Sequence, residues 1–278
     1  EYKQYENQAA EIYTTESSDR AFEEEVMLSG FASARVKPEG SGVAFDNAQE
    51  TFTARYTNET IALAFAITEE AIEDNLYDRL ASRYTKALAR SMASTKQVKG
   101  ASTLNNGFGT FQSGDGVALF STAHPTIAGT FSNTLATAAD LNETSLEQAL
   151  IDIAALTDER GLKIAAKGVK MIIPSALQFT AERLMKSQGR VSTADNDINA
   201  IRSMGMIPQG YRVNNYLTDT DAFFITTDVP NGMKHFNRAP LTTKMEGDFD
   251  TGNVRYKARE RYVFGVSDPR GIFASPGA

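Results

Sequence analysis

The clearest hydrophobic pattern in the chain lies between Thr68 and Ala93. Apolar side chains recur there at every fourth position, a spacing that places them on one face of a helix. They are Ile72, Leu76, Leu80, Tyr84, Leu88 and Met92. Thr68 can cap the first turn, because its hydroxyl can accept a hydrogen bond from a free backbone N–H group. The pattern predicts a helix of about seven turns, which at ~1.5 Å per residue is roughly 40 Å long.

Alternating apolar and polar positions predict strands on both sides of this helix. Large apolar residues alternate with alanines from Ile61 to Ile67. Near the end of the chain, apolar residues between Val254 and Val266 alternate with cations. The cations are Arg255, Lys257, Arg259 and Arg261. This second pattern predicts a long, half-buried strand with one basic face.

Two β-rich segments, residues 26–36 and 43–56, flank the turn sequence Pro38-Glu39-Gly40-Ser41-Gly42. Proline and glycine favour a turn there, so the segments predict a long hairpin. Few large apolar side chains lie on either strand, and an isolated hairpin is marginally stable in water. We therefore expect the hairpin to rest on another surface. Residues 1–24 are polar and acidic with scattered aromatic side chains, which predicts an extended arm.

Helical and strand patterns alternate in the middle of the chain and predict an α/β layer over residues 144–227. The sequence Thr144-Ser145-Leu146-Glu147 fits a capping box that opens a helix ending at Arg160-Gly161. The remaining elements are strands at 169–173, 211–216 and 222–227 and a helix at 176–186.

Composition narrows the classes of function. The 278 residues are 41% hydrophobic and 23% charged, which is typical of a folded protein, and we find neither a signal peptide nor a membrane span. Lys and Arg number 28 and Asp and Glu 35, and the net charge of −7 argues against a free-standing nucleic-acid binder. The absence of Cys excludes thiolate nucleophiles and disulfides, and two His cannot make a three-histidine zinc site.

Motifs that suggest catalysis have simpler explanations. The glycine-rich run from Gly107 to Gly114 has no strand-to-helix context, so it does not predict a dinucleotide site. Ser121, His124 and Asp140 contain the groups of a catalytic triad, but Ser121 lies outside any GxSxG elbow and only three residues from His124. A structural role for His124 is the better interpretation.

Charge is segregated along the long helix. Its first half carries Glu69, Glu70, Glu73 and Asp74, and its second half is basic, which matches the helix dipole. Oxygen ligands could bind a divalent ion, but neighbouring helix positions point in different directions, so a solvated helix start is the better interpretation. The basic strand face could contact phosphates, meet these acids within or between subunits, or simply face solvent.

The order of these parts resembles the major capsid protein of tailed double-stranded DNA bacteriophages, which has the Hong Kong 97 fold. Three segments look like capsid segments: Gly114–Pro125, Lys170–Leu177 and Arg261–Ser275. The resemblance spans nearly the whole chain. It implies an α+β fold with four parts: an N-terminal arm (1–25), an extended β-hairpin loop (26–57), a peripheral domain (58–130 and 235–278) with a spine helix at about 68–95, and an α/β axial domain (131–234).

The resemblance also implies a structural function and no enzymatic activity, metal or cofactor. The family assembles as pentamers and hexamers into an icosahedral shell that encloses the phage DNA genome. The implied partners are other copies of the chain, a portal protein, a scaffold, a decoration protein and DNA contacted non-specifically, with no membrane. The implied location is the virion capsid, assembled in the host bacterial cytoplasm. The start at Glu1 is compatible with the removal of an N-terminal segment that is frequent in the family.

Candidate intersubunit contacts lie in the hairpin, the acidic helix start and the basic strand. They are Lys37, Glu39, Glu69, Glu70, Glu73, Asp74, Arg255, Lys257, Arg259 and Arg261. One family member crosslinks its subunits through a lysine of this loop, but we match no partner asparagine or assisting acid to Lys37 and do not transfer that activity. Two alternatives stay open: an encapsulin-like nanocompartment shell that binds a cargo protein, and a small-molecule hydrolase that uses Ser121 and His124.

Overall fold

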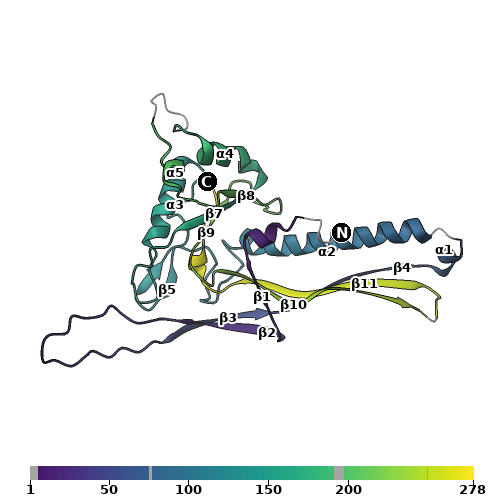
Figure 1. The fold of residues 1–278 in the computed structure, drawn as a ribbon, viewed down its shortest axis with the longest axis horizontal. Helices are drawn as coiled ribbons and strands as arrows, with labels where there is room; N and C mark the ends of the chain where they lie inside the picture. The colour runs from purple at the N-terminus through teal and green to yellow at the C-terminus, as the bar shows by residue number, and fades with distance from the viewer. Residues whose placement is uncertain (1–5, 75–76, 191–196, 249) are drawn as a thin grey trace. The chain divides into compact units, whose positions relative to one another are not determined.

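The computed structural model describes residues 6–74, 77–190, 197–248 and 250–278, without the side chains of residues 77–81. Its contacts divide the chain into two units (Figure 1). The first unit consists of Glu1–Glu23, Tyr56–Ala101 and Lys234–Phe264. The second consists of Glu24–Arg55, Ser102–Met233 and Gly265–Ala278.

A four-stranded sheet forms the base of the first unit, in the order β1-β10-β11-β4. Its strands are β1 (Thr14–Ser17), β10 (Met233–Gly247), β11 (Val254–Val266) and β4 (Glu59–Ile67). β1 runs parallel to β10, and β4 runs antiparallel to β11. The structure confirms the predicted strands β4 and β11. The sequence does not predict β10, because buried and exposed positions do not alternate along it: its first four residues are all buried and its last six are all exposed.

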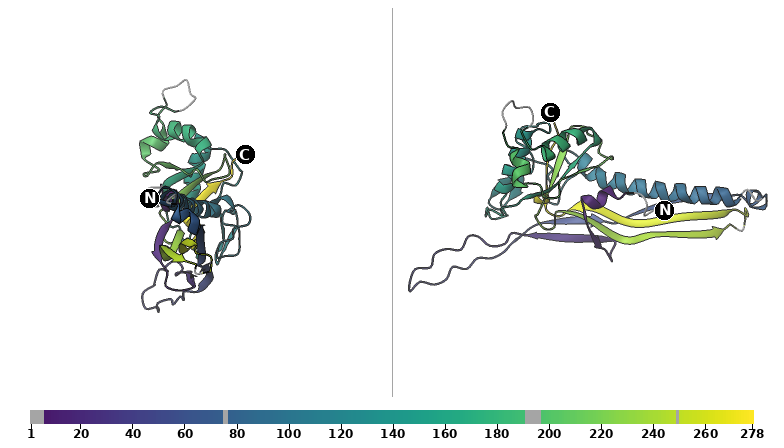
Figure 2. Two further views of the ribbon diagram at one scale, coloured as in Figure 1. Left: turned by 90° about the vertical axis from the view of Figure 1, so that its right-hand side faces the viewer. Right: turned by 45° about the horizontal axis from the view of Figure 1, so that its top comes forward.

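The helix α2 (Tyr77–Asn105) lies along one face of this sheet (Figures 1 and 2). Leu88 and Met92 pack there against Ala258 of β11. Residues Leu76 and Leu80 of the predicted stripe lie outside the described side chains. Among the described side chains of the stripe on α2, Tyr84 is exposed, and Leu88 and Met92 are buried.

The limits of the predicted spine helix, residues 68–95, need correction. A separate short helix, α1 (Glu69–Glu73), is capped by Thr68 and ends at Asp74, while α2 continues to Asn105. The apolar periodicity stops at Met92 because the next buried positions are small or polar. Gln97 accepts a hydrogen bond from the backbone of Ala9 in the arm at 2.8 Å. A β-carbon at Gly100 would lie 2.8 Å from that of Ala9, so glycine lets the arm pack closely.

The second unit contains the predicted α/β layer. Its sheet has the order β12-β9-β7-β8. The strands are β12 (Ile272–Ser275), β9 (Phe223–Thr227), β7 (Gly168–Ile173) and β8 (Tyr211–Val213). The helices are α3 (Glu143–Ala155), α4 (Gln178–Lys186) and α5 (Ala200–Met204), and the short segments are β5 (His124–Thr126), β6 (Gly129–Phe131), η3 (Ser175–Leu177) and η4 (Pro269–Gly271). Residues from α3, β7 and β12 form its buried core, including Leu146, Ile153, Met171 and Phe273.

The cap of α3 lies two residues before the predicted one. The side chain of Asn142 accepts a hydrogen bond from the backbone N–H of Ser145 at 2.8 Å, and the Ser145 hydroxyl accepts one from the backbone N–H of Asn142 at 3.0 Å. Asparagine is as good an N-cap as serine or threonine, so the sequence contains two overlapping candidates for the capping box, one that begins at Asn142 and one that begins at Thr144. The helix ends at Ala155, earlier than the predicted stop at Arg160-Gly161.

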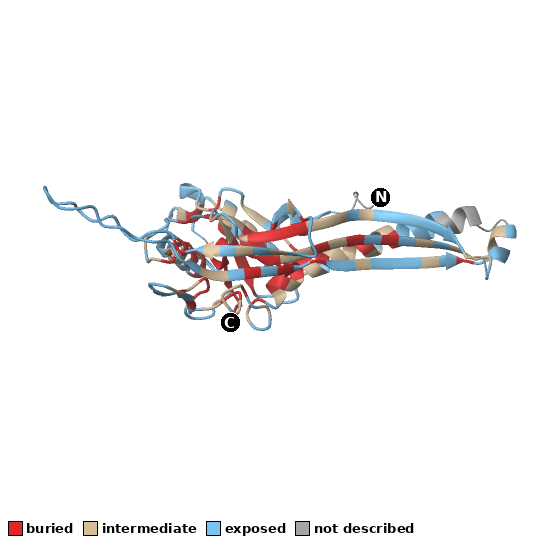
Figure 3. Ribbon diagram, turned by 90° about the horizontal axis from the view of Figure 1, so that it is seen from below, coloured by how far each residue is buried: buried red, intermediate tan, exposed pale blue. Residues whose placement is uncertain are grey.

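The predicted hairpin is a two-stranded sheet only at its base, where β2 (Phe22–Leu28) pairs with β3 (Glu50–Thr57). We call residues 29–49 the hairpin loop; it forms no regular strand and is exposed along its outer part (Figure 3). Arg160 holds one end of the loop, since its Nη2 donates to the carbonyl of Asn47 at 2.7 Å. The side chains of Val36 and Phe45 are 94% and 98% exposed. Residues 31–50 are all exposed in the described part of the chain, and an uncovered two-stranded hairpin is only marginally stable, which accounts for the absence of regular strands in the loop.

This division of contacts differs from the predicted domain limits. Residues 102–130 and 265–278 were assigned to the peripheral domain but cluster with the second unit. The reason is packing within that unit. The ring centres of Phe120 and Phe224 of β9 lie 5.5 Å apart. In addition, β12 is a strand of the second sheet. The division into four functional parts stays a prediction. Within the described residues, the helices are too short or too polar to span a lipid bilayer.

Candidate assembly surfaces

The outer face of β11 carries the predicted basic row. Lys257 and Arg259 are exposed and lie opposite Ala64 and Ala62 of β4. These alanines are short and also exposed, so the cations stand beside a flat strip of sheet. Arg261 differs from the others because it is only partly exposed and its Nε is buried without a hydrogen-bond partner.

The acidic helix start lies on α1 in the same unit, and its residues Glu69, Glu70, Glu73 and Asp74 are exposed. Within the described residues, no ion pair joins this acidic helix start to the basic row. Arg255 pairs with Asp248 in the turn between β10 and β11. Within the described part of the chain, neither Lys257 nor Arg259 has an ion-pair partner, and no group of three or more His, Asp and Glu is arranged to hold a metal ion.

Lys37 and Glu39, the two hairpin candidates, are exposed near the tip of the hairpin loop. At the other end of the loop, Asp46 accepts a hydrogen bond from the backbone of Ala32 at 2.8 Å. The backbone hydrogen bonds from Ala32 and Asn47 lower the pKa of the Asp46 carboxyl below its ordinary value. The loop therefore has an ordered base and an uncovered tip.

The inner face of β11 contains a buried charge that the sequence analysis missed. Glu260 is 2% exposed and lies 3.6 Å from the ammonium group of Lys96 on α2. The same ammonium group lies 4.7 Å from the ring centre of Tyr262. The alternation of β11 indicated that Glu260 is buried, because position 260 falls among the inward-facing positions of this strand. A carboxylate there required a cation from the helix, since an unpaired buried charge is costly.

His235 of β10 is another buried polar group of this unit. Its ring is stacked 4.6 Å from Phe264, and its Nδ1 lies 3.1 Å from the hydroxyl of Thr15 in β1. Burial, followed by the nearby charge of Lys96, lowers the pKa of His235 to about 4. The ring is therefore neutral at pH 7 and joins the arm strand to the sheet.

We expect the stability of the chain to fall between pH 6.5 and 4 because of His235. The folded pKa of about 4 lies below the ordinary 6.5, so the unfolded state binds more protons in this window. The free energy of unfolding should drop by roughly 3 kcal/mol across the window and stay flat above it. Urea unfolding at pH 7.5 and 4.5, compared between the wild type and His235→Phe, isolates this contribution. An equal loss of stability in both proteins would contradict it.

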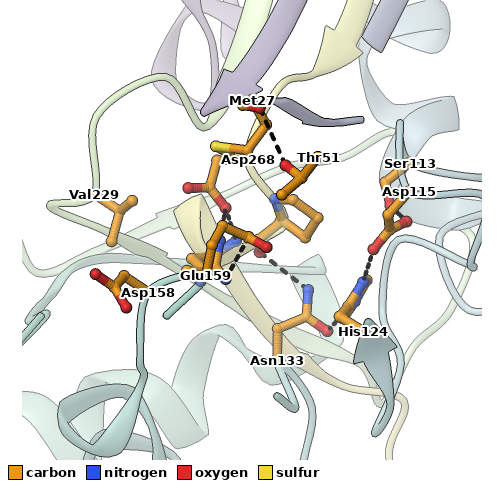
Figure 4. A network of polar contacts seen from close by, with 12 residues as sticks. Met27, Thr51, Ser113, Asp115, His124, Asn133, Asp158, Glu159, Val229 and Asp268 are labelled. Atoms are coloured by element: carbon orange, nitrogen blue, oxygen red, sulfur yellow. Dashed lines mark hydrogen bonds and ion pairs between the residues drawn. The ribbon is translucent and has the colours of Figure 1, made fainter. Parts of the chain in front are cut away.

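A buried network in the second unit is centred on Arg270, and Figure 4 labels two of its partners, Glu159 and Asp268. Its Nη2 donates to Glu159 at 2.7 Å, its Nη1 to Asp268 at 3.3 Å and its Nε to the carbonyl of Thr157 at 2.7 Å. The guanidinium carbon also lies 4.1 Å from the ring centre of Phe131. Burial raises the pKa of Asp268 above its ordinary value although Arg270 opposes the shift. The network fixes the segment of chain that leads into β12.

His124 belongs to a second part of this network and is fully buried. Its Nδ1 lies 2.6 Å from Asp115, and its Nε2 lies 3.2 Å from the carbonyl of Leu119 and 3.1 Å from the Asn133 side chain. Burial raises the pKa of Asp115, but hydrogen bonds from His124, from the Ser113 hydroxyl and from a backbone N–H outweigh it and hold the pKa below its ordinary value. The geometry confirms the structural role predicted for His124.

The arrangement of Ser121, His124 and Asp140 does not form a triad. Both ring nitrogens of His124 face acceptors other than these residues. The Ser121 hydroxyl instead accepts a hydrogen bond from the backbone of Ala123. The hydrolase alternative therefore has no support at the residues on which it depended.

Comparison with known proteins adds to this geometry. The profile of a family described as phage capsid protein matches residues 50–275, which is most of the chain. The chain belongs to the phage capsid protein family. This assignment confirms the predicted family, the α+β Hong Kong 97 fold and the structural function as a major capsid shell protein of the virion. No curated protein sequence matches it significantly.

Solved capsid structures share the fold of this capsid protein at low sequence identity. The cyanophage P-SCSP1u capsid is 13% identical with a TM-score of 0.60, over 96% of this chain and 86% of the other. The capsid of the native GTA particle is 15% identical with a TM-score of 0.60, over 99% and 91%. The structure of Mycobacterium phage Che8 is 16% identical with a TM-score of 0.57, over 98% and 93%.

Proposed function

We propose that this capsid protein assembles as pentamers and hexamers into an icosahedral shell around a phage double-stranded DNA genome. The observation that carries the proposal is the hairpin loop, which exposes Val36 and Phe45 almost completely. Single exposed apolar residues are normal on a protein surface, but here two of them lie on one extended loop that no other described residue covers. A neighbouring copy supplies that cover in a closed shell, and the family assignment supports this arrangement.

The same proposal includes further partners and a place of assembly. A portal protein, a scaffold and a decoration protein are the partners that the family resemblance implies, and the host bacterial cytoplasm is the place. The acidic net charge of −7 supports a shell that encloses DNA without binding it tightly over its whole surface. Candidate contacts between copies are the exposed residues of the hairpin loop, α1 and β11.

Electron microscopy of the purified full-length chain, alone and with its scaffold, tests the proposal. We expect closed shells with five-fold vertices. A chain that remains monomeric or dimeric under all conditions would contradict shell formation. Mass spectrometry of purified shells distinguishes the encapsulin-like alternative, which predicts an enclosed cargo protein other than the scaffold, the portal protein and the decoration protein.

Reversal of Arg259 tests whether the basic row of β11 meets the acidic start of α1 on another copy. We expect Arg259→Glu to weaken assembly and Arg259→Glu combined with Glu73→Lys to restore part of it. Each exposed ion pair contributes only about 0–1 kcal/mol, so the effect depends on repetition around the shell and on salt. Light scattering during assembly at 50 and 300 mM salt measures it. Unchanged assembly of Arg259→Glu at both salt concentrations would show that this face lies outside the contacts.

A further inference from the structure

A cavity of about 340 Å³ lies beside the Arg270 network, where the hairpin loop begins at Ser29 and Gly30. Acidic side chains from three separate stretches of the chain line this cavity, and Arg270 is the one cation among its described lining residues. The acids are Asp158, Glu159, Asp228 and Asp268. Four carboxyl groups beside one guanidinium leave a formal excess of three negative charges. The cavity therefore favours a positively charged occupant.

The most deeply buried of these acids lacks a hydrogen-bond donor. Glu159 is 3% exposed, and its Oε1 accepts a hydrogen bond from Arg270 at 2.7 Å. Its Oε2 is buried and has no hydrogen-bond partner among the described residues. A buried carboxylate oxygen without a donor is costly, so this atom indicates a missing donor. Burial also holds the pKa of Asp268 above its ordinary value against the effect of Arg270, so one cation does not compensate for both buried acids.

The two more exposed acids are held in place by the backbone. One carboxylate oxygen of Asp158 accepts hydrogen bonds from the N–H groups of Arg160 and Leu162 at 2.9 and 2.8 Å. One oxygen of Asp228 accepts a hydrogen bond from the N–H group of Lys167 at 2.8 Å. Among the described residues, the second oxygen of each of these carboxylates accepts no hydrogen bond. Both acids are therefore fixed in position and can still bind a donor.

The remaining lining residues indicate the kind of cation. The described acids form no group that is arranged to hold a metal ion. Met27, Ile164 and Val229 add apolar walls, and in Figure 4 Met27 and Val229 lie near Asp268. An alkylammonium ion matches both parts of this lining, because its nitrogen carries three donors and its carbon chain packs on apolar side chains.

We propose that this cavity binds the primary ammonium group of an aliphatic amine. The ammonium group supplies the donor and the charge that the acids lack, and the carbon chain lies against the apolar wall. A volume of about 340 Å³ is at the lower end of the range of small-molecule pockets, roughly 300–1,000 Å³. The lining residues all belong to one unit of one chain, so the proposal does not depend on shell formation.

Isothermal titration calorimetry of the unassembled full-length chain with 1,5-diaminopentane tests the proposal. We expect saturable binding of this diamine and none of 1,5-pentanediol, which has the same carbon chain but no charge. Glu159→Gln should weaken binding of the diamine by roughly 10- to 100-fold, because hydrogen bonds to charged groups are strong. A wild type that does not bind the diamine, or that binds the diol equally well, would overturn the proposal.

Two further variants keep the test decisive if Glu159→Gln does not fold. Asp228→Asn removes a charge from the exposed side of the cavity and keeps an oxygen for the N–H group of Lys167. Asp221→Asn makes the same change at an exposed position of the same unit outside the cavity lining. We expect Asp228→Asn to weaken binding of the diamine and Asp221→Asn to leave it unchanged. Equal losses would show that the amine responds only to net charge, and the cavity would be excluded as its site.

Purified shells distinguish two sources of the ammonium group, a free amine and a lysine side chain of another copy. Shells that bind the diamine assign the cavity to a free amine. Shells that exclude the diamine, although the unassembled chain binds it, assign the cavity to a lysine of another copy. Binding by a chain that forms no shells supports the cavity and contradicts the proposed function alone, whereas shells from a chain that binds no amine overturn the cavity alone.

Discussion

Arg270→Met is expected to lower the free energy of unfolding by about 3–5 kcal/mol, because it leaves two buried carboxylates without their cation. Arg270 is 3% exposed and pairs with Glu159 and Asp268 at once. Methionine fills much of the same space but offers no charge and no donor. Folded domains of ordinary stability have only about 5–15 kcal/mol in total, so this loss should also reduce the yield of folded chain.

Urea unfolding of the purified chain at pH 7.5, followed by circular dichroism, measures this loss. Lys163→Met is the matched control, since Lys163 is an exposed cation in the same unit and its replacement should change stability by less than about 0.5 kcal/mol. If Arg270→Met does not fold, Arg270→Lys keeps one charge and should show a smaller loss than methionine. An unfolding midpoint equal to that of the wild type in Arg270→Met would contradict the role of the network.

The Arg270 network also shows where sequence reasoning stops. Glu159 and Arg270 are separated by 111 positions, and no local pattern relates them. The strand β11, by contrast, was predicted within its observed limits because its alternation is local and one of its faces is buried. Glu260 lies in that alternation, but its partner Lys96 belongs to α2, so the pair became visible only with the fold.

Helix limits were predicted less well than strands for a related reason. The stripe that predicted α2 consists of large apolar residues, whereas the following turns of the helix are buried through Gln97, Gly100 and Ala101. Small and polar residues become buried there because the arm packs on them, and the arm has no periodic signal of its own. Local patterns predict single helices and strands. The resemblance to capsid proteins, recognised from the order of these parts, was needed to predict the overall fold.

The hairpin loop gives the second large effect. Phe45→Ser is expected to raise the protein concentration needed for assembly by roughly 10- to 100-fold, because burial of a phenylalanine side chain contributes about 1.5–3 kcal/mol per contact. The side chain is 98% exposed in one chain, so its replacement should leave the free energy of unfolding of the unassembled chain unchanged. A loss of assembly without a loss of stability is the result that identifies the loop as a contact between copies.

Two further variants make this result specific to the loop. Phe45→Leu keeps an apolar side chain and should assemble nearly as well as the wild type. Phe179→Ser makes the same chemical change on α4, where Phe179 is 73% exposed, and should have the smaller effect. Light scattering over a range of protein concentrations measures the threshold for each variant. An equal rise in the threshold for Phe45→Ser and Phe179→Ser would point to general surface hydrophobicity, whereas a rise for Phe45→Ser alone places a neighbouring copy over the hairpin loop.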